Sequence, residues 1–266
     1  MTRLAAHRGG ARLWPENSLR AFRESMALGV DLLELDVHLS ADGRVVVVHD
    51  AMLERTTDGS GAVGERTAAE LAALRLRGPD GVLTDERLPT FADVLAVVAP
   101  SRAGLLVEVK GPVAGVNVMY QRSDGDARIT PGPAYPGLVD KTLAALRQAS
   151  MLGRVNVMGF SPEVVTETRA LEPSVPTTFL VAAAHVRSVD APPEAPIAWA
   201  RRLGATDLGI QHTLASPDVM AAARAAGLRV GVWTVNDEEA MRHVIALGVD
   251  VLTTDRPDLA RRVLGR

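Results

Sequence analysis

The segment VDLLELDVHL, from Val30 to Leu39, places acidic residues inside a hydrophobic run of strand length. Side chains alternate between the two faces of a strand, so Glu34, Asp36 and His38 share one face and the aliphatic residues between them share the other. A buried carboxylate must be hydrogen-bonded, paired with a cation or bound to a metal, because otherwise it takes up a proton. The segment therefore predicts a buried strand whose charged face has a partner.

On both sides of this strand, short hydrophobic runs alternate with helical patterns, which is typical of a parallel sheet. Eight such strands, each followed by a helix, in a chain of 266 residues predict a closed (β/α)₈ TIM barrel, with residues 1–266 forming one domain. An open doubly wound sheet is the alternative. The predicted strands are Leu4 to His7, Leu32 to Val37, Leu105 to Val109, Val155 to Phe160, Thr177 to Val181, Asp207 to Ile210, Arg229 to Val235 and Asp250 to Thr253.

Several of these strands are followed by residues that commonly begin helices. A polar side chain capable of capping stands before each helical pattern, in two cases directly before a proline. The predicted starts are Asn17 or Ser18, Ser161 with Pro162, Ser216 with Pro217, and Asn236 with Glu239.

A hairpin strand, an insertion and a long loop depart from the strand and helix repeat. The dipeptide Asp42-Gly43 precedes RVVVVHD, which predicts a hairpin strand that ends at His49 and Asp50. Residues 51–88 are rich in charged and turn-forming residues and are expected to form a small insertion after the second strand. Residues 111–136, rich in glycine and proline, are expected to form a long loop that is either a lid or disordered.

Composition excludes several classes of protein. The net charge is −3 and aromatic residues make up 3% of the chain, so a nucleic-acid partner is not expected. Cysteine is absent, which excludes disulfides and thiolate chemistry and agrees with a cytoplasmic location. We also expect no membrane-spanning segment, since no apolar run reaches the required length of about 18 residues. The sequence does not determine the oligomeric state.

Acidic residues lie toward the carboxyl ends of two predicted strands. Glu34 and Asp36 belong to the second strand, and Glu108 belongs to the third. The carboxyl ends of barrel strands meet at one rim, where the chemistry of such enzymes takes place. Three carboxylates without a thiolate suit a hard divalent cation, Mg²⁺, Ca²⁺ or Mn²⁺, better than structural zinc.

Histidines and cations are predicted at the same rim. His7 ends the first strand and His49 the added hairpin, so the two imidazoles can serve as a general acid and base pair. Arg8 and Lys110 supply positive charge for a phosphate. The alternative is a buried ionic network in which these two cations neutralise the strand carboxylates without a metal.

The sequence as a whole resembles the bacterial glycerophosphodiester phosphodiesterases, members of the phospholipase-C-like phosphodiesterase superfamily. The resemblance covers nearly the whole chain. It rests on AHRGG with PENSLRAF, LELDVHLSADGRVVVVHD with ERTTDGSG, LPTFADVL, VEVK, GVWTVND and GVDVLTTDRPDL.

This resemblance implies a barrel with an inserted subdomain and one divalent cation, Mg²⁺ or Ca²⁺ with Mn²⁺ as an alternative. It implies hydrolysis of a small-molecule glycerophosphodiester to sn-glycerol 3-phosphate and an alcohol. The implied roles are metal binding by Glu34, Asp36 and Glu108, catalysis by His7 and His49, phosphate contact by Arg8 and Lys110, and substrate contact by Trp233.

Other functions would use these residues or require different ones. A lysophospholipase D type activity would use the same site, whereas a metal-independent phosphoinositide lyase would not need three carboxylates. A metal-dependent amidohydrolase would use His185, His212 and Asp255 but also requires a His-x-His pair that the first strand lacks. A barrel that only binds phosphorylated ligands would be expected to lack a histidine or a metal carboxylate.

The segments bordering the expected pocket depart from the family pattern. GARLWPEN is bulky in the first turn, and residues 111–136 form a longer segment than expected. Trp14, Tyr120 and Tyr135 are therefore candidates for an unusual alcohol-binding wall, or else lie in mobile loops. Asn17 is expected to cap a helix, and Glu16 to tether the first loop.

Overall fold

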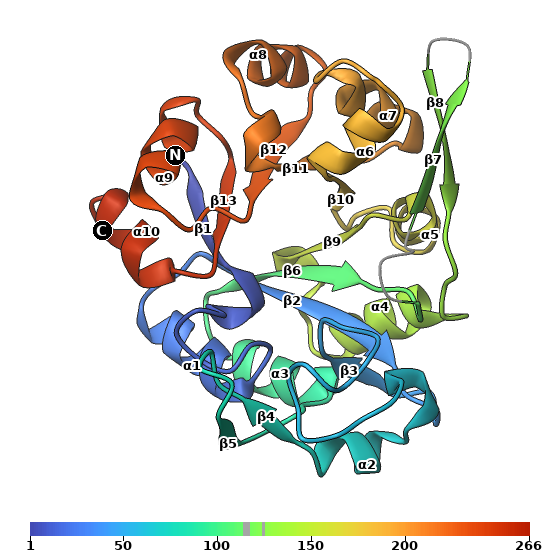
Figure 1. The fold of residues 1–266 in the computed structure, drawn as a ribbon, viewed down its shortest axis with the longest axis vertical. Helices are drawn as coiled ribbons and strands as arrows, with labels where there is room; N and C mark the ends of the chain where they lie inside the picture. The colour runs from blue at the N-terminus through green and yellow to red at the C-terminus, as the bar shows by residue number, and fades with distance from the viewer. Residues whose placement is uncertain (114–117, 124–125) are drawn as a thin grey trace.

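Eight parallel strands close into a barrel in a computed structural model that describes residues 1–113, 118–123 and 126–266 (Figure 1). The first strand pairs with both the second and the last, and these pairings close the sheet. The predicted TIM barrel is thus confirmed, and the open sheet is not formed. The barrel strands are β1 (Arg3–Ala6), β2 (Leu32–Leu39), β6 (Gly104–Val109), β9 (Val155–Gly159), β10 (Thr177–Val181), β11 (Asp207–Gln211), β12 (Arg229–Trp233) and β13 (Val251–Thr254).

Helices surround the barrel, and they bury one face against it (Figure 1). The aliphatic face of β2, including Leu33 and Leu35, packs outward into this core with Phe22 and Phe91. The opposite face points into the barrel and carries the acidic residues. The surrounding helices are α1 (Leu19–Ala27), α3 (Phe91–Val98), α4 (Leu138–Gln148), α5 (Pro162–Leu171), α6 (Ala183–Ser188), α7 (Ala195–Leu203), α8 (Pro217–Ala225), α9 (Glu238–Ala246) and α10 (Pro257–Val263).

The predicted capping residues are only partly confirmed. Ser161 and Ser216 cap α5 and α8, and Ser18 caps α1 by accepting a hydrogen bond from the backbone N–H of Ala21. Asn17 and Asn236 cap no helix, because Ser18 caps α1 and Asp237 caps α9. Both asparagines are instead hydrogen-bonded to aspartates near the carboxyl ends of the strands.

The chain doubles back after β2, as the Asp42-Gly43 turn predicted. Strand β3 (Val45–Val47) pairs with β2 in antiparallel orientation. The following segment contains η2 (Val63–Glu65), α2 (Ala68–Ala72), β4 (Arg75–Arg77) and β5 (Leu83–Arg87). This segment packs around a hydrophobic cluster separate from the barrel core, formed by Val46, Val48, Leu53, Val63, Leu71, Leu76 and Leu88.

The prediction of a long loop after the third barrel strand is wrong, because most of the described residues of that segment form two strands. Strands β7 (Val118–Ser123) and β8 (Asp126–Pro131) pair as an antiparallel hairpin beside the barrel (Figure 1). Residues 114–117 and 124–125 of the expected loop lie outside the described residues. Tyr120 fixes the hairpin to the barrel, because its ring stacks on His185 and packs against Trp199.

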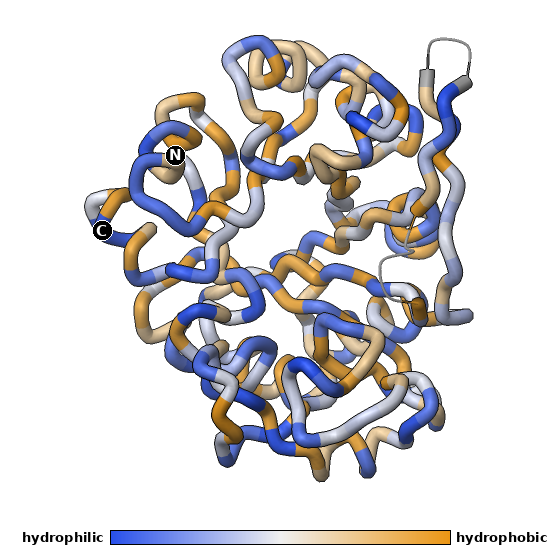
Figure 2. The backbone as a smooth tube through the Cα atoms, viewed as in Figure 1, coloured by the Kyte–Doolittle hydropathy of each residue, from blue (hydrophilic) through white to orange (hydrophobic). Residues whose placement is uncertain are grey.

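Hydrophobic residues occur in short runs broken by hydrophilic ones (Figure 2). Among the described residues, no helix has both the length and the apolar composition that a bilayer crossing requires. Short 3₁₀ turns η1 (His7–Gly9), η3 (Leu152–Arg154) and η4 (His212–Leu214) complete the elements. His7, expected as the last residue of β1, is therefore the first residue of a tight turn.

Candidate active site

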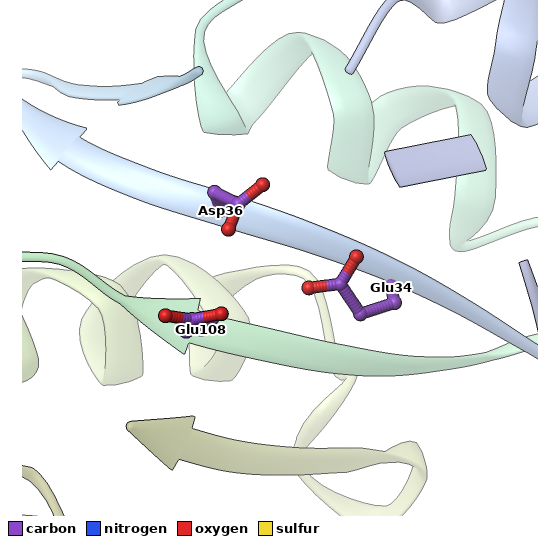
Figure 3. A group of neighbouring side chains, drawn as sticks. All are labelled: Glu34, Asp36 and Glu108. Carbon is purple, nitrogen blue, oxygen red and sulfur yellow. The ribbon is translucent and has the colours of Figure 1, made fainter. Parts of the chain in front are cut away.

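Three carboxylates from two neighbouring strands converge inside the barrel. Glu34 and Asp36 come from β2, and Glu108, which is in register with Asp36, comes from β6 (Figure 3). One carboxylate oxygen of each residue lies within 4.8 Å of an oxygen of the other two. Their exposed fractions are 1%, 0% and 7%, so the cluster is almost completely removed from water.

Two cationic side chains and several hydrogen-bond donors contact these acids and partly offset their charge. Lys110 Nζ lies 3.0 Å from Asp36 Oδ1 and 2.5 Å from Glu108 Oε1. Arg8 donates its backbone N–H to Glu34 Oε2 at 2.8 Å, and its Nε is 3.5 Å from Asp36 Oδ2. Asn17 Nδ2 donates to the same Asp36 oxygen at 2.9 Å. The contacts of the carboxylates with Arg8 and Lys110, considered as the alternative to a metal, thus exist in the fold.

The pKa values show that this neutralisation is incomplete. Burial raises the pKa of Asp36, but the charges of Lys110, His49 and Arg8 outweigh it and leave that pKa far below its usual value. The pKa of Glu34 is raised well above its usual value by burial and by the charges of Asp36 and Glu108. Glu34 therefore lacks enough positive charge nearby to ionise easily.

The carboxylate cluster fits a hard divalent cation. All three donors are oxygens, the ligands that Mg²⁺ and Ca²⁺ prefer. Although Lys110 is close, Asp36 Oδ1 receives no hydrogen bond from any described residue. A cation at this position would favour the ionised form of Glu34, which burial and the charges of Asp36 and Glu108 disfavour.

The turn after β1 is shaped to bring His7 and Arg8 to this cluster. Gly9 has φ +76°, and a Cβ there would lie 2.7 Å from the Cβ of Ala21 in α1. Arg8 itself is left-handed, with φ 50°. The glycines of HRGG thus permit a close approach to α1 that aims the backbone N–H of Arg8 at Glu34.

His7 is oriented by an aspartate from the last strand's end. Its Nδ1 donates to Asp255 Oδ1 at 2.6 Å, and Asn236 Nδ2 donates to the other oxygen of Asp255 at 2.7 Å. This contact leaves Nε2 of His7 on the side of the acids, 3.9 Å from Glu34 Oε2. Sequence reasoning missed this role of Asp255, although closure of the barrel brings the end of β13 beside β1.

His49 is oriented in the same way by its neighbour in sequence. Its Nδ1 donates to Asp50 Oδ1 at 2.6 Å. Arg55 of the inserted segment contacts Asp50 and also donates to both oxygens of Glu16 at 2.8 Å. Glu16 in turn accepts from Arg8 at 3.1 Å, so the first turn is tethered through Glu16.

One cavity collects these groups at the mouth of the barrel and extends into its interior. Apart from Asp36, which lies beside it, the predicted site residues all line the cavity: His7, Arg8, Glu34, His49, Glu108, Lys110 and Trp233. Further along the wall are apolar side chains, Met158, Phe160 and Leu180. Trp233 meets Phe160 edge to face, with ring centroids 5.5 Å apart.

The histidines of the amidohydrolase alternative are not brought to the cluster. His185 lies in α6, stacks on Tyr120, and accepts a hydrogen bond from the backbone N–H of Ala182. His212 begins η4, and neither histidine lines the cavity that holds the three acids. Asp255 contacts His7 instead of completing such a metal site.

The remaining aromatic candidates and His38 have structural contacts. Tyr135 places its hydroxyl 3.2 Å from Nδ1 of His38, whose Nε2 lies 3.1 Å from the carbonyl oxygen of His49. Burial lowers the pKa of His38 to about 4, so it is neutral and supports His49. Trp14, Tyr120 and Tyr135 do not line the central cavity and therefore form no alcohol-binding wall there.

Comparison with known proteins places this geometry in a family. A relative from Caldanaerobacter subterraneus, named glycerophosphodiester phosphodiesterase, is 28% identical over 258 residues, covering 97% of this chain and 95% of the relative. A Bacillus subtilis protein of the same name is 29% identical over 270 residues, covering 97% and 85%.

Solved structures of similar proteins have the same fold. The crystal structure of glycerophosphodiester phosphodiesterase from Agrobacterium tumefaciens is 26% identical with a TM-score of 0.75, covering 98% of this chain and 100% of that one. An Oleispira antarctica phosphodiesterase solved with its product sn-glycerol-3-phosphate has the same fold, with 24% identity, a TM-score of 0.76, and coverage of 100% and 98%. Since the model of the glycerophosphoryl diester phosphodiesterase family matches residues 7–259, the chain belongs to that family and is a phosphoric diester hydrolase.

Proposed function

We propose that the protein hydrolyses a glycerophosphodiester to sn-glycerol 3-phosphate and an alcohol in a reaction that depends on a divalent cation. The observation that carries this proposal is the shared cavity of His7 and His49, each with Nδ1 on a carboxylate, beside three buried acids. The product held by the Oleispira antarctica phosphodiesterase is the one proposed here.

We propose Mg²⁺ or Ca²⁺ as the native cation, with Mn²⁺ as an alternative, held by Glu34, Asp36 and Glu108. When bound, such a cation supplies positive charge to the phosphate as negative charge develops on it. Lys110 and Arg8 add charge at the same place, because both contact the acid cluster and line the cavity. Their interactions lower the barrier to the extent that they strengthen in the transition state.

Proton transfer falls to the two imidazoles. Because Nδ1 of each ring donates to an aspartate, Nε2 is the atom left to exchange protons in the cavity. One imidazole removes the proton of the nucleophile, either water or the glycerol 2-hydroxyl, and the other protonates the departing alcohol. If the glycerol hydroxyl attacks, a cyclic phosphate forms and is hydrolysed in a second step, in which the two imidazoles exchange their roles as acid and base.

We propose that Trp233 contacts the substrate. Its ring lines the cavity beside Phe160, and its Nε1–H has no hydrogen-bond partner among the described residues. We also propose that residues 51–88 are an inserted subdomain of a single barrel domain. Two observations support that division: this segment has its own hydrophobic cluster, and its Arg55 contacts Asp50 at the site.

Turnover of glycerophosphocholine, glycerophosphoethanolamine and bis(p-nitrophenyl) phosphate by chelated protein, with and without added Mg²⁺, Ca²⁺ or Mn²⁺, tests the proposal. Activity is expected only with a cation. His7→Ala and His49→Ala should each abolish turnover, and Glu34→Ala should also lose cation binding. His243→Ala, on the exposed face of α9, is the control that should keep full activity. Full activity in either catalytic histidine variant, or in chelated wild type, would contradict the mechanism.

A further inference from the structure

A second groove lies beside the active site and is lined mainly by arginines. It runs between the first turn, the inserted segment and the residues after β13. Four arginines line it, Arg12, Arg55, Arg77 and Arg256, against a single carboxylate, Glu16. The remaining lining residues are small: Ala11, Thr56, Gly78, Pro79 and Gly81.

This groove is directly connected to the residues assigned to catalysis. Arg55 shares Asp50 with His49 and shares Glu16 with Arg8. Arg12, which also lines the groove, has its Nε 3.9 Å from Asp255 Oδ2, and Asp255 contacts His7. A ligand in the groove is therefore separated from both imidazoles by one carboxylate on each side.

Donors in the groove remain free for a ligand. The Arg12 side chain is 60% exposed, and its guanidinium donates no hydrogen bond to any described residue. Arg77 donates Nε and Nη1 to the carbonyl oxygens of Thr57 and Gly81, which leaves Nη2 and the full positive charge unpaired by a described carboxylate. Arg256 uses Nε and Nη2 on Asp258, so its Nη1 is also available.

The single acid of the groove does not cancel this charge. Glu16 is held between Arg8 and Arg55, with hydrogen bonds from both. Burial raises its pKa, but the hydrogen bond from Arg55 and the charge of Arg8 outweigh burial and lower that pKa. The negative charge of Glu16 is thus balanced by Arg8 and Arg55. Arg77, which has no described carboxylate partner, and the exposed Arg12 leave the groove positively charged.

We propose that this groove binds a phosphate monoester carried by the alcohol portion of the substrate, so that the enzyme prefers glycerophosphodiesters whose alcohol is itself phosphorylated. Planar guanidinium groups with free N–H donors match phosphate oxygens better than a zwitterionic or neutral alcohol. The inference rests on the proposed function, since the groove is given its role by its position beside that site.

A matched pair of substrates tests this inference. Glycerophosphoinositol and glycerophosphoinositol 4-phosphate differ by one phosphate monoester. Wild-type protein is expected to show kcat/KM about ten-fold higher for the phosphorylated substrate, the effect of about one charge-assisted hydrogen bond. In the double variant Arg12→Gln, Arg77→Gln the ratio should fall to about one, because kcat/KM for the phosphorylated substrate falls further than kcat/KM for glycerophosphoinositol.

Two controls separate a binding role from a structural one. Arg242→Gln removes an arginine of similar exposure, 63%, that lies on α9 outside the groove, and should keep the wild-type ratio. Arg12→Lys with Arg77→Lys keeps the charge and should retain part of the preference. Equal kcat/KM of wild type for both substrates, or an equal loss for both in the double variant, would overturn the inference.

Failure of the proposed function gives a different result. If wild-type protein with cation hydrolyses neither compound, the proposed function fails. Calorimetric titration of the full chain with inositol 4-phosphate then tests whether the groove binds a phosphate monoester. Binding that is lost in the double glutamine variant supports the groove. Absence of binding, or equal binding by the variant, overturns it.

Discussion

Asp255 shows how one residue can decide the state of a group that we propose to be catalytic. It accepts the Nδ1 proton of His7 and is itself held by Asn236, so the His7 tautomer is fixed before substrate arrives. The sequence places Asp255 after the last predicted strand, where we weighed it only for an amidohydrolase site. Its actual neighbour is His7, because the last and first strands of a closed barrel pair.

The predicted site residues gather at one cavity, but their supporting partners could not be foreseen. Strand alternation and the carboxyl-end rule were enough to bring together Glu34, Asp36 and Glu108. Asn17 and Asn236 carry ordinary capping signals in the sequence, and only the tertiary structure shows that each is hydrogen-bonded to an aspartate near the site. A local sequence pattern can indicate where a helix begins. It does not indicate a contact between loops that lie far apart in the sequence.

Replacing Asp255 with Asn tests the orienting role at the residue scale. An amide can donate to Nδ1 and would favour the wrong tautomer of His7, so kcat should fall by about 10²-fold or more. Cation affinity should be unchanged, because Asp255 contacts none of the three acids. Steady-state kinetics and calorimetric cation titration of the same sample measure both quantities. An unchanged kcat would contradict the assigned orientation.

At the scale of elements, regular periodicity determined what could be predicted. The eight barrel strands are short hydrophobic runs, and the structure reproduces them within one or two residues. The hairpin β7–β8 was missed because its strands are polar and flanked by glycine and proline. The dipeptide Asp124-Gly125, a common hairpin signal, was the available indication in the sequence.

The hairpin should be held to the barrel by Tyr120. Tyr120→Ala removes a ring that contacts His185 and Trp199 and should lower the free energy of unfolding by about 2 kcal/mol. Met119→Ala, at the preceding position but 48% exposed, should change it by less than about 0.5 kcal/mol. Tyr120→Phe should be neutral or stabilising, because the buried hydroxyl has no partner among the described residues. Urea denaturation measures all three, and equal effects of the two alanine variants would refute the packing role.

At the scale of the whole molecule, stability and cation binding should be linked through Glu34. The folded pKa of Glu34 lies above the ordinary value of 4.5, so the folded protein holds this proton more tightly than the unfolded chain. In cation-free protein, the contribution of Glu34 to stability therefore increases as the pH falls through the folded pKa and levels off below about 4.5. Asp36 has the opposite shift, and its contribution is lost only in strong acid, below its ordinary value of 3.8.

Glu34→Gln isolates this linkage. At pH 7.5 in chelator, the variant should be more stable than wild type by about 1–3 kcal/mol, since it removes a buried carboxyl group that must either ionise against Asp36 and Glu108 or hold a proton at this pH. Divalent cation at 100 times its Kd should stabilise wild type by about 2.7 kcal/mol and leave the variant nearly unchanged. Thermal unfolding with and without cation measures both effects. A variant stabilised by cation as strongly as wild type would show that Glu34 is not a ligand.

The central claim is that Glu34, Asp36 and Glu108 hold one divalent cation within reach of His7 and His49. Anomalous diffraction from crystals of the full chain grown with Mn²⁺ tests it most directly. We expect a single strong anomalous peak among the three carboxylates, beside the two imidazoles. A peak elsewhere, or Lys110 and Arg8 alone filling the space between the carboxylates at saturating Mn²⁺, would contradict it.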